Sequence, residues 1–248
     1  GVGVTNNSQK EPNKETIDAL RAYLNHPGMQ MIHVRDVESY TWIKDNLSPK
    51  CRLFYSPDIV CSLPLLEKRR GLEKNPTPVF GILTRKTAKP DQVQTAKIIA
   101  SVEHFKALGW KTRAILLGTG STLDDDLADF EKRKIVVDEV VVRDSNVALI
   151  DDVISCDLLG SMKFHGCIVG MIAGVPTLSW AQTDKFKNFY KNIGRMDLIA
   201  PLGGDQTAKL LAEGIAPLDE ARLAQISQEA RDALGELVRR YPDSEYAA

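Results

Sequence analysis

One segment of the chain combines residue types that bind an anion and move a proton. It runs from Ser161 to Gly166 (SMKFHG), and an apolar stretch, 167–176, follows it. Lys163 brings a positive charge, and His165 brings an imidazole, the side chain best suited to proton exchange near neutral pH. We expect the segment at a strand-to-helix turn, where backbone N–H groups and the helix dipole attract anions. The sequence therefore predicts a phosphate or carboxylate site here, with His165 as its acid or base.

The overall composition is that of an ordinary α/β protein and narrows the classes of partner. The chain has 248 residues, of which 43% are hydrophobic and 6% aromatic. Lys and Arg total 32 against 33 Asp and Glu. The near-zero net charge therefore does not favour binding to nucleic acid or to an anionic membrane. No apolar run approaches the ~18 residues of a membrane-spanning helix, and no signal peptide opens the chain. These features predict a cytoplasmic protein whose anion site is local.

The cysteine and aspartate patterns give no indication of a metal site. Cys156 and Cys167 lie among apolar residues, where a reduced and buried thiol is expected, and together with Cys51 and Cys61 they are too scattered for a metal knuckle. The run of three aspartates at 124–126 lies where a helix should begin. Carboxylates complement the dipole at a helix start, so this run is expected to be solvated.

Hydrophobic periodicity predicts strands that alternate with helices on both sides of a charged, proline-punctuated linker at 68–78. Alternation of this kind implies parallel βαβ units in a doubly wound sheet, with ligands at the carboxyl ends of its strands. The expected strands are 1–5, 29–34, 52–55, 79–83, 112–117, 136–142, 158–161 and 176–180. The expected helices are 16–25, 39–46, 91–108, 123–132, 147–155, 166–173 and, with breaks at Gly214 and Pro217, 208–240; the segment 59–66 is a short helix or a loop.

Several motifs within residues 31–202 point to one enzyme family. The cluster of serine, basic residue and histidine in 161–166 is the most specific of them. The segments concerned are His33-Val34-Arg35-Asp36 with Ser39, Ser56-Pro57-Asp58-Ile59, Arg85 after a strand, Ser161 to Gly166, Gly174-Val175-Pro176 and Lys185. In these segments the chain resembles the polysaccharide pyruvyl transferase family.

The resemblance implies a two-lobed α/β fold like that of the GT-B glycosyltransferases, with a doubly wound parallel sheet in the C-terminal lobe. On this basis 1–78 is an incomplete N-terminal, acceptor-side lobe, 79–202 a Rossmann-like donor-binding lobe, and 203–248 the C-terminal helices. The first lobe is expected to be incomplete because the Asn-x-Gly-Asp segment that opens it in many members is absent. Lys163 also stands where many members have arginine, which keeps the charge but loses the bidentate fork.

The resemblance further implies transfer of the enolpyruvyl unit of phosphoenolpyruvate to a saccharide as a cyclic ketal, with release of phosphate. His165 would then be the catalytic acid or base. The groups expected to bind the donor are Arg85, Lys163, Ser161, the N–H groups near Gly166, and Lys185 in a loop after the strand 176–180. No metal or organic cofactor is required. The acceptor is a saccharide, whether lipid-linked or polymeric, and a homo-oligomer remains open.

Each candidate also has a purely structural interpretation, which the sequence leaves open. His165 can cap its turn, Lys163 can face solvent at a strand end, and Arg85 and Lys185 can be solvated charges. The glycine-rich segment 118–121 is expected to reverse the chain.

The sequence predicts two local contacts in the first lobe, and it leaves two other functions open for the whole chain. Arg35 and Asp36 are expected to form a local ion pair, and Asp58 to end a strand through an Asx turn.

One alternative function is that of a GT-B glycosyltransferase that uses a nucleotide sugar, because a fold alone does not fix the chemistry. The other is a non-catalytic module that binds saccharide or phosphate.

Overall fold

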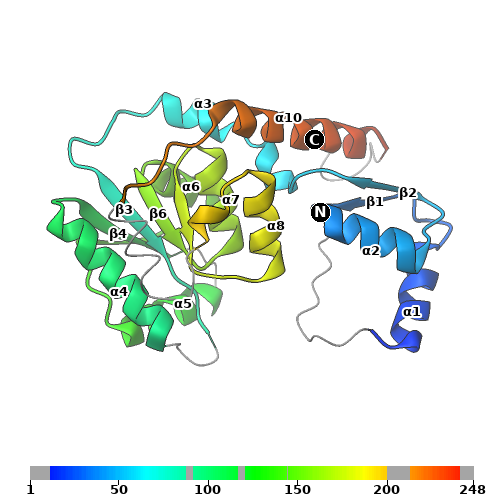
Figure 1. Cartoon of the computed structure of the whole chain (residues 1–248), viewed down its shortest axis with the longest axis horizontal. Helices are drawn as coiled ribbons and strands as arrows, with labels where there is room; N and C mark the ends of the chain where they lie inside the picture. Colours follow the sequence, from blue (N-terminus) through cyan, green and yellow to red (C-terminus); the bar gives the residue numbers. More distant parts are fainter. Residues whose placement is uncertain (1–11, 88–91, 117–120, 144, 200–212, 241–248) are drawn as a thin grey trace.

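The computed structural model describes residues 12–87, 92–116, 121–143, 145–199 and 213–240. It contains two separate sheets, and every strand pairing in them is parallel. The smaller sheet pairs β1 (Met31–Val34) with β2 (Arg52–Tyr55), and the larger has the order β5-β4-β3-β6-β7. Figure 1 shows the two sheets in separate bodies, with α10 (Glu220–Arg240) running from one toward the other.

Two amphipathic helices, α1 (Lys14–Leu24) and α2 (Val37–Leu47), accompany the small sheet. Asp36 is the N-cap of α2, and its carboxylate accepts a hydrogen bond of 2.7 Å from the backbone N–H of Ser39. Capping of this kind satisfies one of the free N–H groups of a first helical turn. The apolar core of this body consists of Ile32, Val34, Ile43 and Leu47.

The five-stranded sheet is doubly wound. Its strands are β3 (Val79–Leu83), β4 (Lys111–Leu116), β5 (Glu139–Val142), β6 (Leu158–Ser161) and β7 (Thr177–Ser179). The connecting helices are α4 (Gln92–Ala107), α5 (Ser121–Arg133), α6 (Asn146–Ile154) and α7 (Phe164–Ile172). Because crossovers are right-handed, α4 and α5 cover one face and α6 and α7 the other (Figure 1). The direction of winding reverses between β3 and β6.

A glycine in β6 allows the sheet to pack tightly under the site. A Cβ added to Gly160 would lie 2.1 Å from a ring carbon of Trp180. Trp180 is itself buried and follows β7. Only glycine therefore leaves room for this indole beside the last residues of β6.

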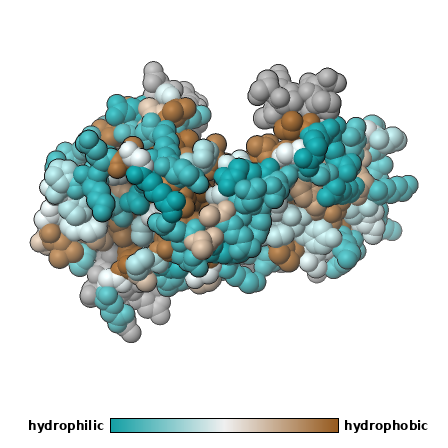
Figure 2. Space-filling model, turned by 90° about the horizontal axis from the view of Figure 1, so that it is seen from above, coloured by the Kyte–Doolittle hydropathy of each residue, from teal (hydrophilic) through white to brown (hydrophobic). Residues whose placement is uncertain are grey.

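The remaining elements lie between the two sheets or pack on the larger body. They are η1 (Ile59–Ser62), α3 (Leu65–Arg70), α8 (Asp184–Asn192), η2 (Met196–Leu198) and α10. The buried face of α10 includes Leu223 and Ile226 at one end and Ala230 and Ala233 further along. Seen from the side of α3 and α10, the surface is mainly hydrophilic, with hydrophobic residues in small patches (Figure 2). Within the part that the structure describes, no helix is long and apolar enough to cross a membrane.

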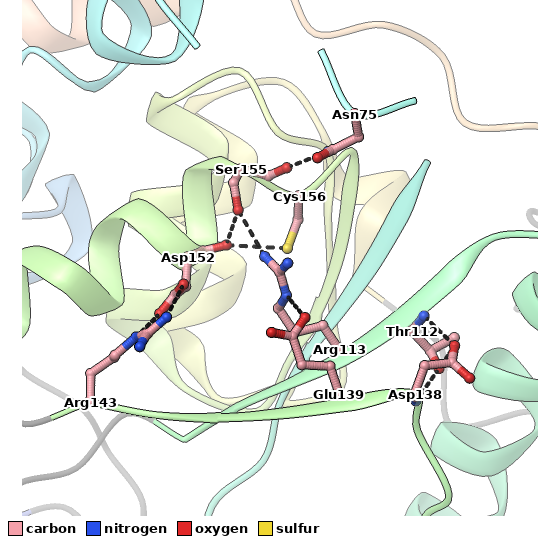
Figure 3. Close-up of polar contacts among 9 residues, drawn as sticks. All are labelled: Asn75, Thr112, Arg113, Asp138, Glu139, Arg143, Asp152, Ser155 and Cys156. Carbon is pink, nitrogen blue, oxygen red and sulfur yellow. Dashed lines mark hydrogen bonds and ion pairs between the residues drawn. The ribbon is translucent and has the colours of Figure 1, made fainter. Parts of the chain in front are cut away.

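Polar contacts fix the starts of β4 and β5 (Figure 3). Asp138, just before β5, accepts hydrogen bonds of 2.8 Å from both the N–H and the hydroxyl of Thr112 in β4. Arg113 donates to Glu139 at 2.8 Å and to Ser155 Oγ at 2.9 Å. These side chains hold the amino ends of the strands together, at the edge opposite the expected site.

The expected elements are largely confirmed, and the strands at 52–55, 79–83 and 158–161 match residue for residue. The α/β class and the doubly wound parallel sheet are confirmed as well. The expected linker is wrong in its first three residues, because the buried Leu65 and Leu66 begin a helix that continues to Arg70. The expected strand 1–5 and most of the turn at 118–121 lie outside the described residues.

Candidate functional site

The carboxyl ends of β3 and β6 lie side by side. Leu83 and Ser161 are register partners, and the N–H of Met162 donates to the carbonyl of Leu83 at 2.8 Å. Arg85 and Lys163 each follow two residues after these partners. Because the winding reverses between β3 and β6, this edge is the switch point at which doubly wound sheets bind ligands.

Ser161 organises the turn that follows β6. Its side chain is fully buried, and its hydroxyl donates to the carbonyl of Lys163 at 2.9 Å. The same oxygen accepts a 3.0 Å hydrogen bond from the N–H of Lys163. The structure thus places Ser161 beneath the turn, where its hydroxyl bonds to the backbone of Lys163.

Helix α7 begins directly after this turn. Lys163 is its N-cap, and Phe164, His165 and Gly166 form its first turn. The first N–H groups of a helix have no acceptor within the helix, and a lysine side chain has no acceptor to offer them. His165 is exposed, with its ring 5.7 Å from that of Phe164, whereas Gly166 is buried. The helix start therefore presents an imidazole beside N–H groups that favour an anion.

Lys163 is paired with Asp126 of α5. Their side chains form an ion pair in which the lysine is 15% exposed and the aspartate 4% exposed. The other oxygen of Asp126 accepts a 2.7 Å hydrogen bond from the N–H of Lys86, after β3. The expectation of a solvated aspartate run is wrong for Asp126, because this residue faces the sheet edge while Asp124 and Asp125 remain exposed.

Lys185 lies in helix α8, so its expected place in a loop is wrong. The helix forms because Phe186, Phe189 and Tyr190 share one buried face. The Lys185 ammonium is 5.3 Å from the centre of the Phe164 ring. Burial lowers the pKa of Lys185, and the positive charges of Arg35 and Arg85 lower that pKa further. Lys185 is therefore within electrostatic reach of both arginines.

Arg35 reaches the same aromatic ring from the small sheet. Its guanidinium carbon lies 4.8 Å from the centre of the Phe164 ring, and its Nη1 donates to Asp58 at 3.2 Å. The expected ion pair between Arg35 and Asp36 is wrong, because the Asp36 carboxylate is used as the cap of α2. The Asx turn at Asp58 is confirmed, since the other oxygen of its carboxylate accepts from the N–H of Val60 at 3.2 Å.

A cavity of about 370 Å³ separates the small sheet from helices α7 and α8. Arg35, Asp58 and Tyr55 line it on one side, and Phe164 and Lys185 on the other. Figure 1 shows α7 and α8 on the side of the larger body that faces the small sheet. Arg85 and His165 are exposed, and neither belongs to the described wall of this cavity. The predicted residues thus occupy two adjoining places: the strand edge, with Arg85, Lys163 and His165, and the cavity, with Lys185.

Two buried polar groups lie near these places. The His33 ring forms a 2.6 Å hydrogen bond with the Ser56 hydroxyl, and burial lowers its pKa to about 4. Among the described residues, the buried hydroxyl of Thr84 has no hydrogen-bond partner, and Thr84 directly precedes Arg85. His33 is therefore neutral at pH 7 and adds no charge to the cavity.

Sequence reasoning missed Arg35 and Asp126 as parts of the site. Arg35 lies in a motif that the family resemblance uses, but its contact with Phe164 spans more than a hundred residues. Asp126 had no signal beyond its place in an aspartate run. Both are brought to the site by the packing of elements rather than by a local pattern.

Comparisons with known proteins agree with the motifs. The family model "Polysaccharide pyruvyl transferase" matches residues 1–181. Comparison with curated protein sequences finds no match. Among solved structures, sucrose-phosphate synthase from Thermosynechococcus elongatus is similar at 12% identity with a TM-score of 0.45, over 96% of this chain and 65% of that one. The chain thus spans less than two thirds of that structure. On the family match, which covers most of its residues, the chain belongs to the polysaccharide pyruvyl transferase family.

Proposed function

We propose that this protein transfers the enolpyruvyl unit of phosphoenolpyruvate to two neighbouring hydroxyls of a saccharide, forming a cyclic ketal and releasing phosphate. The family match supports a pyruvyl transferase. The observation that carries the proposal is the exposed His165 at the start of α7, beside the cations Arg85 and Lys163 at the carboxyl ends of β3 and β6.

The donor brings a phosphate and a carboxylate, so its site must supply positive charge and N–H donors. Arg85 and Lys185 are cations within electrostatic reach of each other, and the first turn of α7 adds backbone N–H groups. An ammonium group carries three N–H donors, and Asp126 holds that of Lys163 in place. We propose that these groups bind the two anionic ends of phosphoenolpyruvate. Ser161 would stabilise the conformation of the turn that leads into α7 and Gly166.

The reaction requires a proton at one carbon and a nucleophile at the next. A proton adds to the methylene carbon, and positive charge develops at C2. A first saccharide hydroxyl attacks C2 and gives up its proton, and the C2–O bond to phosphate then breaks. A second hydroxyl attacks C2 and loses its proton, so that the ketal and hydrogen phosphate account for all atoms and charges. His165 is suited to deliver and receive these protons, a role worth ~10²–10⁴-fold in rate.

The proposal assigns the two bodies different tasks. Residues 79–202 hold the donor, because the strand edge and the start of α7 belong to this part. Residues 1–78 present the acceptor, whose class we take to be a saccharide, whether lipid-linked or polymeric; of these residues, 35–38, Tyr55, Pro57 and Asp58 line the cavity. Residues 203–248 contribute α10, which packs on the body and reaches the small sheet through an ion pair of 2.6 Å between Arg52 and Glu236.

The proposal is tested by incubating the chain with phosphoenolpyruvate and a panel of saccharides with neighbouring hydroxyls. Phosphate release is followed together with the mass of the saccharide product. We expect both signals to appear with at least one saccharide and to disappear without it. Phosphate release that does not depend on any saccharide, or consumption of a nucleotide sugar instead, would contradict the proposal.

A further inference from the structure

Two cations lie over the ring of one phenylalanine between the two bodies, and a third positive charge acts on one of them. The guanidinium carbon of Arg35 is 4.8 Å, and the ammonium of Lys185 is 5.3 Å, from the centre of the Phe164 ring. Arg85 acts on Lys185 as a like charge. Cations favour an aromatic face, but they repel one another, so a cluster of this kind is most stable when an anion lies between its members.

The protein supplies Arg35 with one carboxylate. Its Nη1 donates to Asp58 at 3.2 Å, and its side chain is 17% exposed. Within the described part of the chain, its Nε is buried and has no hydrogen-bond partner. A guanidinium has five N–H donors in a fixed plane, and an unpaired buried donor destabilises the site. Arg35 therefore has donor capacity that Asp58 does not use.

The exposed part of the Arg35 side chain borders the cavity. Arg35 lines the cavity together with Phe164 and Lys185, and its aromatic contact limits the orientations of the guanidinium. A planar fork of N–H groups matches the oxygens of a carboxylate or phosphate better than an ammonium does.

We infer that Arg35 is a donor-binding residue, which contacts a carboxylate or phosphate oxygen of phosphoenolpyruvate from the small sheet while Lys185 contacts the donor from the larger body. This inference rests on the proposed function, and it adds a donor-binding residue from the first 78 residues. The donor is then bound by both bodies, and its binding stabilises their arrangement around the cavity.

The test measures direct binding by calorimetry with three probes: phosphoenolpyruvate, inorganic phosphate and pyruvate. We expect Arg35→Gln to weaken phosphoenolpyruvate binding about tenfold or more, since a hydrogen bond to a charged group is lost. Arg35→Lys should restore part of the affinity, because it keeps the charge without the fork. A loss confined to phosphate or to pyruvate identifies which end of the donor Arg35 binds.

Two further variants separate binding from a structural role. Arg52→Gln is the matched control, because Arg52 also lies over a phenylalanine of the small sheet, 5.6 Å from the Phe54 ring, but outside this cavity. It should bind phosphoenolpyruvate as the unchanged chain does. Asp58→Asn keeps an acceptor for Val60 and removes the carboxylate that competes for Arg35, so it should bind phosphoenolpyruvate at least as tightly.

The outcomes distinguish the two claims. If the unchanged chain binds phosphoenolpyruvate and Arg35→Gln binds it equally well, the role of Arg35 is refuted while the proposed function stands. If Asp58→Asn loses affinity as much as Arg35→Gln does, the pair acts by supporting the fold, and the inference is overturned. If the unchanged chain binds phosphate but not phosphoenolpyruvate, the proposed function and the donor assignment of Arg35 both fail.

Discussion

Asp126 and Lys163 form an ion pair that joins α5 to the turn after β6. The pair is largely buried, and Asp126 also accepts a hydrogen bond from the backbone after β3. One carboxylate thereby orients the cation of the site and ties together the ends of the two strands at the switch point. Asp126 is a positioning residue in this account.

Asp126→Asn should therefore affect both stability and donor binding. Removing one partner of a buried ion pair leaves the other charge uncompensated, and because Lys163 retains some solvent contact we expect a loss of about 2 kcal/mol in the free energy of unfolding. The KM for phosphoenolpyruvate should rise more than kcat falls. Denaturant unfolding and steady-state kinetics check these effects.

Asp125→Asn is the control for that variant. Asp125 is exposed and pairs with Lys86 at 2.8 Å, and exposed pairs contribute little to stability. Equal effects of the two substitutions would show that Asp126 has no special part in the site.

His165→Ala should lower kcat by ~10²–10⁴-fold if the imidazole moves protons in the reaction. The side chain is exposed, so the thermal midpoint should stay within the range of a neutral surface substitution. Phosphoenolpyruvate affinity should change little, since the cations and N–H groups remain. His26→Ala, at an exposed position after α1, serves as the control and should retain full turnover. Unchanged kcat in His165→Ala would remove His165 as the acid or base.

The sequence predicts much of this site because its groups follow elements with strong local signals. Alternating apolar runs place β3 and β6, and the order of strands and helices places their carboxyl ends at one edge. Arg85, Lys163 and His165 follow from that topology. The helix of Lys185 does carry a local signal, because Phe186, Phe189 and Tyr190 have helical spacing and form its buried face; the expectation of a loop overlooked this pattern. The pairs of Arg35 with Asp58 and of Lys163 with Asp126 form only after distant elements pack.

Stability should fall as the pH is lowered, through His33. Burial lowers the pKa of His33 to about 4 in the folded state, whereas an unfolded chain has a histidine pKa near ~6.5. As the pH falls, the unfolded state thus binds a proton before the folded state does. The free energy of unfolding therefore decreases between about pH 6.5 and pH 4. Allowing for solvent near the ring, we expect a loss of about 2 kcal/mol from this residue.

The measurement compares the free energy of unfolding at neutral pH and at the acid end of that window, for the unchanged chain and for His33→Gln. Glutamine can keep a hydrogen bond to Ser56 but does not titrate in this range. The variant should show a smaller loss of stability than the unchanged chain. A pH dependence that is the same in both would exclude His33 as its cause.

Gly160→Ala should destabilise the sheet beneath the site. Its Cβ would lie 2.1 Å from the Trp180 ring, so the indole or the strand must shift, and overpacking of this kind costs ~1–3 kcal/mol. Gly235→Ala is the matched control, because Gly235 lies within α10 and its nearest neighbour to an added Cβ is at 3.7 Å. That change should stabilise the chain by ~0.5–1 kcal/mol. Thermal unfolding of the two variants should show shifts of opposite sign, and shifts of the same sign would contradict the packing described for β6.

The central claim is that phosphoenolpyruvate is protonated at its methylene carbon and joined to a saccharide as a ketal. The most direct measurement runs the reaction in deuterated water and analyses the product by mass spectrometry and NMR, with phosphate measured in parallel. We expect a ketal whose methyl group carries solvent deuterium, formed in equal amount with phosphate. A ketal methyl group without deuterium, or a saccharide product that forms from a nucleotide sugar and releases no phosphate from phosphoenolpyruvate, would contradict this claim.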